Sequence, residues 1–360
     1  MIERPAPKPR EGMPSPKLDK AAFLERYCER FDDPAFEATR AEIDRIAEIA
    51  WEAYADERKA PRTHKAGSGF ADPGYDLADD WSAARRAVDV AQARHDADGD
   101  PAVLIVNGSP RSEHSCPSEM SKSWRLLEIA QATCEAEGAE VATLDLSRLA
   151  SEYGRHIHPC KACFSTAAAL CHWPCSCYPN HGLGQVQDWM AEIYPMWVRA
   201  HGVMLVTPVH WYSPTAPMKL MMDRLVCADG GNPDPTSTQG KDAQLAKSLE
   251  LAGWPYPRHL AGRLYGIVVH GDSEGAENVR RGLSDWLSSL ELRSAGTMAE
   301  VDRYIGYWQP YATSHDELDR DDAIQQETAN AARTLVRAIR ADRAGRLADA
   351  AEGLAAPRDK

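Results

Sequence analysis

One short stretch constrains the fold of this chain more than any other: an apolar strand that runs directly into a loop of small residues and then into a helix. The apolar residues 103–106 are followed at once by Asn107-Gly-Ser-Pro-Arg111, and a helical pattern begins near Ser118. In open α/β sheets such a loop holds phosphate, because backbone N–H groups and the helix dipole converge on the anion while hydroxyl and guanidinium groups add hydrogen bonds. We interpret this stretch as a phosphate loop.

From residue 101 onward, segments with strand and helix spacing alternate. Strands are expected at 103–106, 140–146, 203–206, 263–270 and 296–301, and helices at 118–137, 183–199, 217–227, 275–290 and 321–349. This alternation is typical of a parallel sheet covered by helices on both faces. The Gly- and Pro-rich residues 229–262 interrupt it, and so long an insertion is usually functional, as a lid or an oligomer contact.

The α/β domain is predicted to span residues 101–304, with other segments on either side of it. Residues 1–100 are predicted to form an N-terminal arm and a helical extension, with helices near 34–57 and 81–95. The extension is expected to pack on the core domain or on a neighbouring subunit. Residues 305–360 are predicted to be a C-terminal helix and tail.

Composition excludes several classes of protein. The 360-residue chain is 43% hydrophobic and carries a formal net charge of −13, which argues against nucleic acid or an anionic membrane as the main partner. No apolar run approaches the roughly 18 residues needed to span a bilayer, and the first residues lack the apolar core of a secretory signal. We therefore expect a cytoplasmic protein with small-molecule partners.

Polar residues follow three of the predicted strands. The first strand leads to Ser109, Arg111 and Ser115, the second segment is Thr207-Pro-Val-His-Trp-Tyr-Ser213, and the third is His270-Gly-Asp-Ser-Glu-Gly275. In a doubly wound sheet the ligand lies beyond the carboxyl ends of the strands, where these three loops would meet. The sequence therefore predicts one site built from three loops.

These loops, together with Lys219-Leu-Met-Met-Asp-Arg224, resemble the flavodoxin-like NADPH-dependent FMN reductase family and its iron–sulfur flavoprotein relatives. The resemblance covers residues 101–300. It implies a flavodoxin-like, doubly wound, five-stranded parallel sheet in the order 2-1-3-4-5. It also implies that the first loop holds the FMN phosphate and that the second runs along the isoalloxazine ring.

The resemblance also assigns residues to the cofactor. Phosphate would be bound by Ser109, Arg111 and Ser115, and the ring would be bordered by Pro208, Val209, His210, Trp211, Tyr212 and Ser213, with His270, Gly271 and Gly275 on its other side. His210 is a possible donor to flavin or substrate. The family often has a small polar pair after the arginine, whereas this chain has His114-Ser-Cys-Pro117, so only Ser115 carries over.

The expected activity is that of an FMN-dependent oxidoreductase. No Gly-x-Gly-x-x-Gly opens a helix after a strand, so NAD(P)H would visit the flavin as a transient donor rather than reside on a dinucleotide fingerprint. The reduced flavin would then reduce an unknown flavin- or quinone-type acceptor, in a homodimer or homotetramer. One alternative is an FMN/iron–sulfur protein that transfers electrons between protein partners. Another is a flavodoxin-like scaffold that has lost its cofactor.

Five cysteines fall within 18 residues: Cys160, Cys163, Cys171, Cys175 and Cys177. Without a secretion signal a disulfide framework is not expected. Three readings remain open: a [4Fe–4S] cluster on four of these thiolates, a structural zinc that also uses His172 or His181, or reduced thiols that pack in a loop. The iron–sulfur flavoproteins place a third cysteine where this chain has Thr166. The scattered Cys28, Cys134 and Cys227 are expected to be buried apolar side chains.

Overall fold

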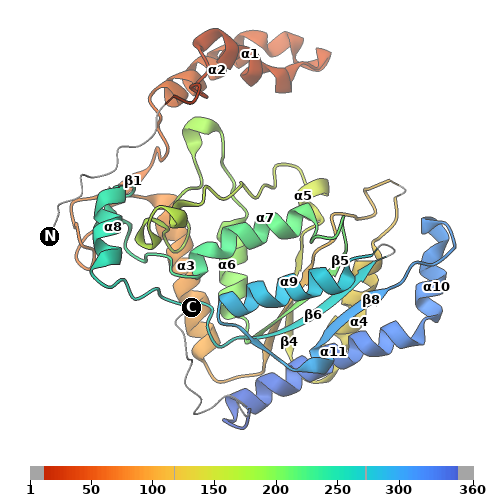
Figure 1. Cartoon of the computed structure of the whole chain (residues 1–360). Coiled ribbons are helices and arrows are strands. Elements are labelled where there is room, and N and C mark those ends of the chain that lie inside the picture. The colour runs from red at the N-terminus through yellow and green to blue at the C-terminus, as the bar shows by residue number, and fades with distance from the viewer. Residues whose placement is uncertain (1–11, 117, 272–273, 348–360) are drawn as a thin grey trace. The chain divides into compact units, whose positions relative to one another are not determined.

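The structure is a computed structural model that describes residues 12–116, 118–271 and 274–347 (Figure 1). The chain forms two compact units: Met1–Pro61 with Asn180–Gly184, and Arg62–Pro179 with Gln185–Lys360. Residues 62–100, which we had grouped with the extension, therefore belong to the larger unit. Most of the predicted N-terminal arm and the end of the C-terminal tail lie outside the described residues.

The smaller unit is built on two helices that share an aromatic cluster. Helix α1 spans Lys20–Cys28 and helix α2 spans Arg40–Ala55, with 3₁₀ turns at Glu29–Phe31, Pro34–Thr39 and His181–Leu183. The ring centroid of Phe23 on α1 lies 4.7 Å from that of Tyr54 and 5.5 Å from that of Trp51 on α2. The sequence predicted a single helix from residue 34. The structure instead begins that segment with a 3₁₀ turn and adds α1, whose nine residues are too few for a clear periodicity.

A parallel sheet forms the centre of the larger unit. Its strands are β3 (Ala102–Asn107), β4 (Glu140–Asp145), β5 (Gly202–Pro208), β6 (Leu264–Gly271) and β8 (Glu300–Tyr304). They lie in the order β4-β3-β5-β6-β8, all parallel, and the two-residue strand β7 (Arg293–Ser294) pairs with the start of β6. This confirms the flavodoxin-like order 2-1-3-4-5.

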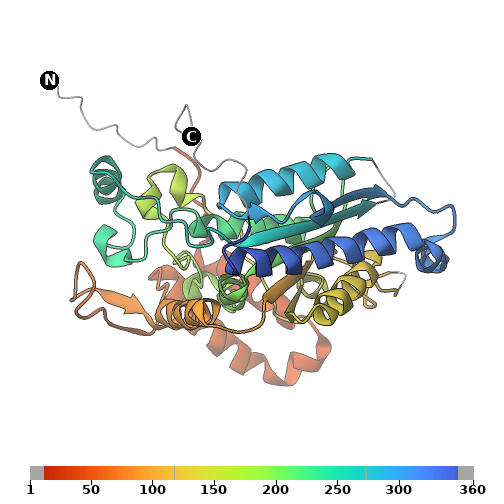
Figure 2. The ribbon, with the colours of Figure 1, turned by 90° about the horizontal axis from the view of Figure 1, so that it is seen from below.

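Helices cover both faces of the sheet, because successive strand residues point to opposite sides. Leu104 and Val106 of β3 belong to one core, with α3 (Asp79–Asp96), α6 (Met190–Arg199), α7 (Ala216–Arg224) and α9 (Ala276–Ser289). Val103 and Ile105 belong to the other core, with α4 (Lys122–Ala136) and α11 (Asp322–Arg343). Figure 2 shows α9 and α11 on opposite sides of the sheet. The buried strands place their carboxyl ends together at one edge.

The connections contain further short elements. Strands β1 (Thr63–Lys65) and β2 (Asp76–Ala78) form an antiparallel pair, and the remaining helices are α5 (Arg148–Ser151), α8 (Ala243–Leu251) and α10 (Ser314–Arg320). Helix α8 lies inside the 229–262 insertion and is capped by Asp242, whose carboxylate accepts hydrogen bonds from the N–H groups of Gln244 and Leu245. None of the described helices is long and apolar enough to cross a bilayer.

Candidate functional site

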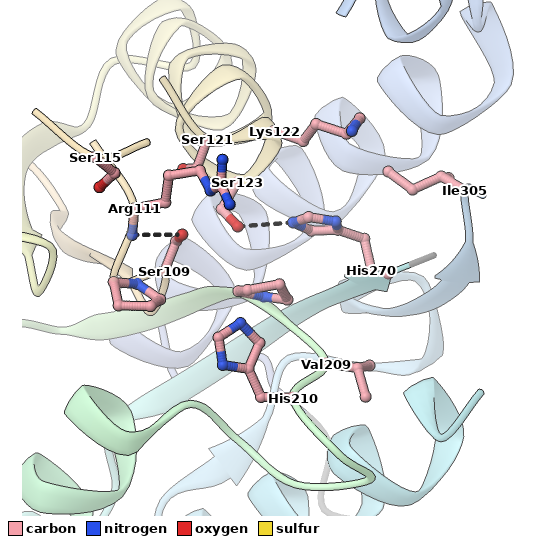
Figure 3. A pocket seen from close by; sticks show the side chains of 13 residues that line it. Ser109, Arg111, Ser115, Ser121, Lys122, Ser123, Val209, His210, His270 and Ile305 are labelled. Atoms are coloured by element: carbon pink, nitrogen blue, oxygen red, sulfur yellow. Dashed lines mark hydrogen bonds between the residues drawn. The ribbon is translucent and has the colours of Figure 1, made fainter. Parts of the chain in front are cut away.

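A cavity of about 370 Å³ lies at the carboxyl ends of β3, β5 and β6 (Figure 3). All three predicted loops contribute to it, as does the start of α4. The residues that line it are Ser109, Pro110, Arg111, Ser115, Ser121, Lys122, Ser123, Pro208, Val209, His210, His270, Gly271 and Ile305. The three sequence segments that we expected to meet at one site therefore do so.

Hydrogen bonds inside the loop after β3 determine its conformation. The N–H of Ser109 donates to Asn107 Oδ1 at 3.1 Å, and the N–H of Arg111 donates to Ser109 Oγ at 3.1 Å. Farther on, the N–H of Ser112 donates to Ser115 Oγ at 3.1 Å. These N–H groups are thus occupied by the loop itself. The expectation that loop N–H groups converge on an anion does not hold for them in this conformation.

Gly108 is required where the loop leaves the strand. A Cβ at this position would lie 2.5 Å from Thr207 Oγ1 and 2.6 Å from Met218 Cε, distances that side chains do not adopt. The carbonyl of Gly108 also accepts a hydrogen bond from the hydroxyl of Thr215, which caps α7. The loop after β3 therefore packs directly on β5 and on the start of α7.

Two cationic side chains line the cavity, one from the loop after β3 and one from the start of α4. Arg111 lies within the loop, and Lys122 is the first residue of α4. Ser121 caps that helix, and its Oγ accepts a hydrogen bond from the N–H of Trp124 at 3.1 Å. We had expected the helix to begin near Ser118, but Ser118 has a φ of 65°, which is incompatible with a helix. Sequence reasoning consequently missed Ser121, Lys122 and Ser123 as site residues.

His270 projects from the end of β6 into the same cavity. It is 4% exposed, and its Nε2 lies 2.7 Å from the Oγ of Ser123 on α4. Burial lowers the pKa of His270 to about 3, and the nearby positive charge of Lys122 acts in the same direction. The imidazole is therefore neutral at physiological pH. Sequence reasoning placed His270 at the site but could not foresee its contact with Ser123.

The loop after β5 contributes Pro208, Val209 and His210 to the cavity, whereas its aromatic pair points elsewhere. The backbones of His210 and Ser213 exchange two hydrogen bonds of 3.0 Å, and this closes a two-residue turn with φ values of 49° at Trp211 and 62° at Tyr212. Such turns favour Gly or Asn. The side chain of Trp211 is 93% exposed. Trp211 is not among the residues that line the cavity, and its predicted contact with the flavin ring stays a prediction.

Tyr212 lies over Gly275 at the start of α9. A Cβ at Gly275, where φ is 108°, would lie 2.8 Å from Tyr212 Cδ1, and the Tyr212 hydroxyl donates to Glu274 at 3.2 Å. Tyr212, Ser213 and Gly275 do not belong to the cavity lining. Their contact with a cofactor likewise stays a prediction, while Gly271 does line the cavity.

The clustered cysteines line a second, much smaller cavity. Cys160, Cys163, Cys171, Cys175 and Cys177 contribute to it, together with His172, Arg224 and Cys227. The Sγ atoms of Cys163 and Cys177 are 3.4 Å apart. The guanidinium of Arg224 is buried and paired with Asp188, at 2.9 and 2.6 Å. Cys227 was expected to be a buried apolar side chain and was not predicted to join this group, because it reaches the cavity only through the packing of the segment after α7.

These thiols differ in their acidity. Burial raises the pKa of Cys171 and of Cys227. A hydrogen bond with Cys177, and burial after it, raise the pKa of Cys175, while a hydrogen bond with Cys177 lowers the pKa of Cys163. Within residues 12–116, 118–271 and 274–347, no group of three or more His, Cys, Asp or Glu side chains is arranged to hold a metal ion. The predicted zinc and [4Fe–4S] sites thus have no support from this arrangement, and the ligand set stays a prediction.

Comparison with known proteins gives one family match. The family model described as NADPH-dependent FMN reductase matches residues 101–301. No curated protein matches the chain. Among solved structures, the chain is similar to RosB with a bound 8-demethyl-8-formylriboflavin-5'-phosphate intermediate (15% identity, 72% of this chain and 95% of that chain, TM-score 0.45). It is also similar to NAD(P)H:quinone oxidoreductase from Methanothermobacter marburgensis (16% identity, 68% and 96%, TM-score 0.39).

Proposed function

The chain belongs to the NADPH-dependent FMN reductase family, and from that premise we propose that its cavity at the ends of β3, β5 and β6 holds FMN. The protein would then be a flavin-dependent oxidoreductase. NAD(P)H would reduce the flavin, and a small flavin- or quinone-type acceptor would reoxidise it. When bound, FMN supplies the hydride and electron chemistry, and the protein supplies binding and orientation.

The observation that carries this proposal is the convergence of two cations and a helix start on one cavity. Arg111 and Lys122 both line it, and α4 directs its N-terminus toward it. A phosphate carries close to two negative charges at neutral pH, so two cations and the positive end of a helix dipole match its charge. Riboflavin, which lacks the phosphate, would gain nothing from them. The site should therefore prefer FMN to riboflavin.

The other wall of the cavity suits a flat, weakly polar ring. Pro208 and Val209 present apolar surface, and the backbone of Gly271 runs so close to Val209 that a Cβ there would lie 3.3 Å from the valine Cβ. His210 is the titratable side chain on this wall and could donate a hydrogen bond to flavin or substrate. Rigid backbone and apolar contacts of this kind would orient the ring without adding charge.

The absorbance spectrum of the protein purified without oxygen tests the proposal. We expect a flavin spectrum, or one that appears on addition of FMN, and we expect NAD(P)H to bleach it. A colourless protein that does not take up FMN would overturn the proposal. If FMN binds but NAD(P)H leaves it oxidised, the proposed binding site is supported and the proposed reductase activity is rejected.

The electron-transfer alternative has one observation in its favour, the six cysteines that line a single cavity. It requires iron and acid-labile sulfide in near-stoichiometric amounts in protein purified without oxygen. The reductase proposal does not require them. Measuring both elements on the sample used for the spectrum separates the two functions.

We also propose that the active unit is a homodimer or homotetramer. Trp211 (93% exposed) and Trp308 (101% exposed) are the large aromatic side chains that such a contact would cover. Light scattering coupled to size-exclusion chromatography measures the mass directly. A monomer at micromolar concentration would reject this part of the proposal.

A further inference from the structure

Two of the clustered thiols lie close enough to react with each other. The Sγ atoms of Cys163 and Cys177 are 3.4 Å apart, so a movement of about 1.4 Å along the line between them would bring them to the length of a disulfide bond. They line the cysteine cavity together with four further cysteines, and its volume of about 20 Å³ has room for about one water molecule. The thiols therefore lie next to one another, with little space between them for a ligand.

Hydrogen bonds hold the two segments that carry these cysteines. Tyr178, which follows Cys177, donates from its hydroxyl to the carbonyl of Pro159 at 2.7 Å. This bond ties the Cys177 segment to the start of the segment that carries Cys163. The carbonyl of Cys163 accepts a hydrogen bond of 3.1 Å from the N–H of Thr166, which closes a 3₁₀ turn. The fold thus keeps the two sulfur atoms near each other in the reduced protein.

The insertion at 229–262 anchors the segment that leads to Cys177. The N–H of Trp173 donates to the carbonyl of Asn232 at 2.9 Å, and the N–H of Asn232 donates to the carbonyl of Cys171 at 2.6 Å. Because these bonds pair the insertion with the cysteine loop in the manner of two strands, the loop has a firm support on this side. Cys177 is therefore presented to its partner by a fixed backbone.

Cys163 is the member of the pair that lies in the more exposed segment. It is half-buried, and its exposed neighbours are Lys161, Ala162, Ser165 and Thr166. The neighbours of Cys177 are by contrast half-buried or buried. Lys161 also lines the cysteine cavity, and its ammonium lies 4.9 Å from the centre of the Tyr178 ring. A molecule that approaches Cys163 from solvent therefore meets a positive charge.

We propose that Cys163 and Cys177 form a redox-active dithiol that exchanges with an anionic disulfide of low molecular weight. Cys163 attacks one sulfur of the small disulfide as its thiolate, so that a mixed disulfide forms at Cys163 and one small thiol leaves with the proton that Cys163 released. Cys177 then attacks the Cys163 sulfur, and the second small thiol leaves with the proton of Cys177. The two cysteines are oxidised to a disulfide, and the small disulfide is reduced to two thiols. This activity does not depend on the proposed FMN site.

The exchange is tested on the reduced, full-length protein with glutathione disulfide, which is negatively charged at neutral pH. All samples carry Cys116→Ser, which removes an exposed thiol outside the cysteine cavity and should itself leave the exchange unchanged. Mass spectrometry after alkylation should show a disulfide between Cys163 and Cys177, and dithiothreitol should regenerate both thiols. With Cys177→Ser the reaction should stop at a mixed disulfide on Cys163. With Cys163→Ser glutathione should be released roughly tenfold more slowly, because the attacking thiolate is gone.

The preference for an anion is tested by comparing glutathione disulfide with hydroxyethyl disulfide, which is uncharged. Lys161→Ala should slow the exchange with glutathione disulfide roughly twofold to tenfold, because an exposed cation attracts an anion only weakly through water. The exchange with hydroxyethyl disulfide should be unchanged. Lys65→Ala, at an exposed lysine of β1 that pairs with Asp76, is the matched control. Equal slowing for both disulfides, or slowing for neither, would overturn the preference for an anion.

The dithiol itself is overturned if no disulfide forms in the unmodified protein, or if a different pair of cysteines forms it. Iron or zinc bound to these thiols in stoichiometric amounts in the purified protein would also overturn it, because metal-bound thiolates are not free to exchange. Circular dichroism establishes that each variant is folded, and the result on the unmodified protein stands without the variants. A failure to bind FMN would reject the proposed function and leave the dithiol in place, so the two failures are distinguishable.

Discussion

Replacing Arg111 by alanine should weaken the binding of FMN but not that of riboflavin, and so isolate the contribution of the phosphate to the affinity. The main-chain N–H of Arg111 donates to the side-chain Oγ of Ser109 at 3.1 Å, a hydrogen bond that does not involve the arginine side chain. Truncating the side chain leaves this main-chain hydrogen bond in place and removes a cation from the cavity. A charged hydrogen bond contributes about 1.5–3 kcal/mol, which corresponds to roughly a tenfold to 150-fold weaker Kd for FMN. Riboflavin binding should be unchanged.

Fluorescence titrations at low and high ionic strength measure both ligands. The unmodified protein should lose FMN affinity as salt rises, and Arg111→Ala should lose less, because one of the two cations is already gone. Arg111→Lys retains the charge without the planar fork and should fall between the two. Arg281→Ala, on the exposed face of α9, is the matched control. Unchanged FMN affinity in Arg111→Ala, or equal losses for FMN and riboflavin, would refute the reasoning.

Three further predictions concern stability and the thiols. Gly108→Ala should lower the free energy of unfolding in urea by about 1–3 kcal/mol, because the alanine Cβ would lie 2.5 Å from Thr207 Oγ1. An unchanged free energy of unfolding would show that the loop can shift to accommodate the Cβ without cost. Because the pKa of His270 is about 3 in the folded state and higher in the unfolded chain, the unfolded chain binds more protons between these values. Stability should therefore fall as the pH drops from 7 toward 4, by at most about 1.4 kcal/mol per pH unit from this group, and His270→Asn should flatten the curve. Mild oxidation with diamide should form a disulfide between Cys163 and Cys177, whose Sγ atoms are 3.4 Å apart. Mass spectrometry after alkylation should then show two thiols that are not alkylated, and in Cys177→Ser the thiol of Cys163 should be alkylated.

The parallel sheet and the position of the site could be predicted from the sequence because both depend on local patterns. The apolar run at 103–106, the strand-loop-helix alternation and the polar residues after three strands are visible without any structure. The alternation of strands with helices predicts that neighbouring strands are parallel, and parallel strands bring their carboxyl ends to the same edge of the sheet. The family resemblance supplied the strand order, which the structure confirms.

The remaining site features depend on end points and on contacts between distant residues. Apolar periodicity indicates which face of a helix is buried but not where the helix begins, so the start of α4 at Lys122 was placed four residues too early. The contact between Ser123 and His270 joins residues 147 positions apart. Cys227 reaches the cysteine cavity through tertiary packing as well. No pattern in a single sequence reports such pairs.

The internal hydrogen bonds of the loop after β3 have a consequence for its motion. Asp145 at the end of β4 accepts from Asn107 Nδ2 at 2.7 Å, and Asn107 in turn accepts from the N–H of Ser109. The carboxylate thereby orients the side-chain amide of Asn107, and the amide oxygen holds the loop through Ser109. The loop is therefore ordered when the protein folds, before any ligand binds. The amide protons of Ser109 and Arg111 should accordingly exchange slowly with solvent even in the flavin-free protein, and removing the Asp145 carboxylate, at a residue that does not line the cavity, should make them exchange fast.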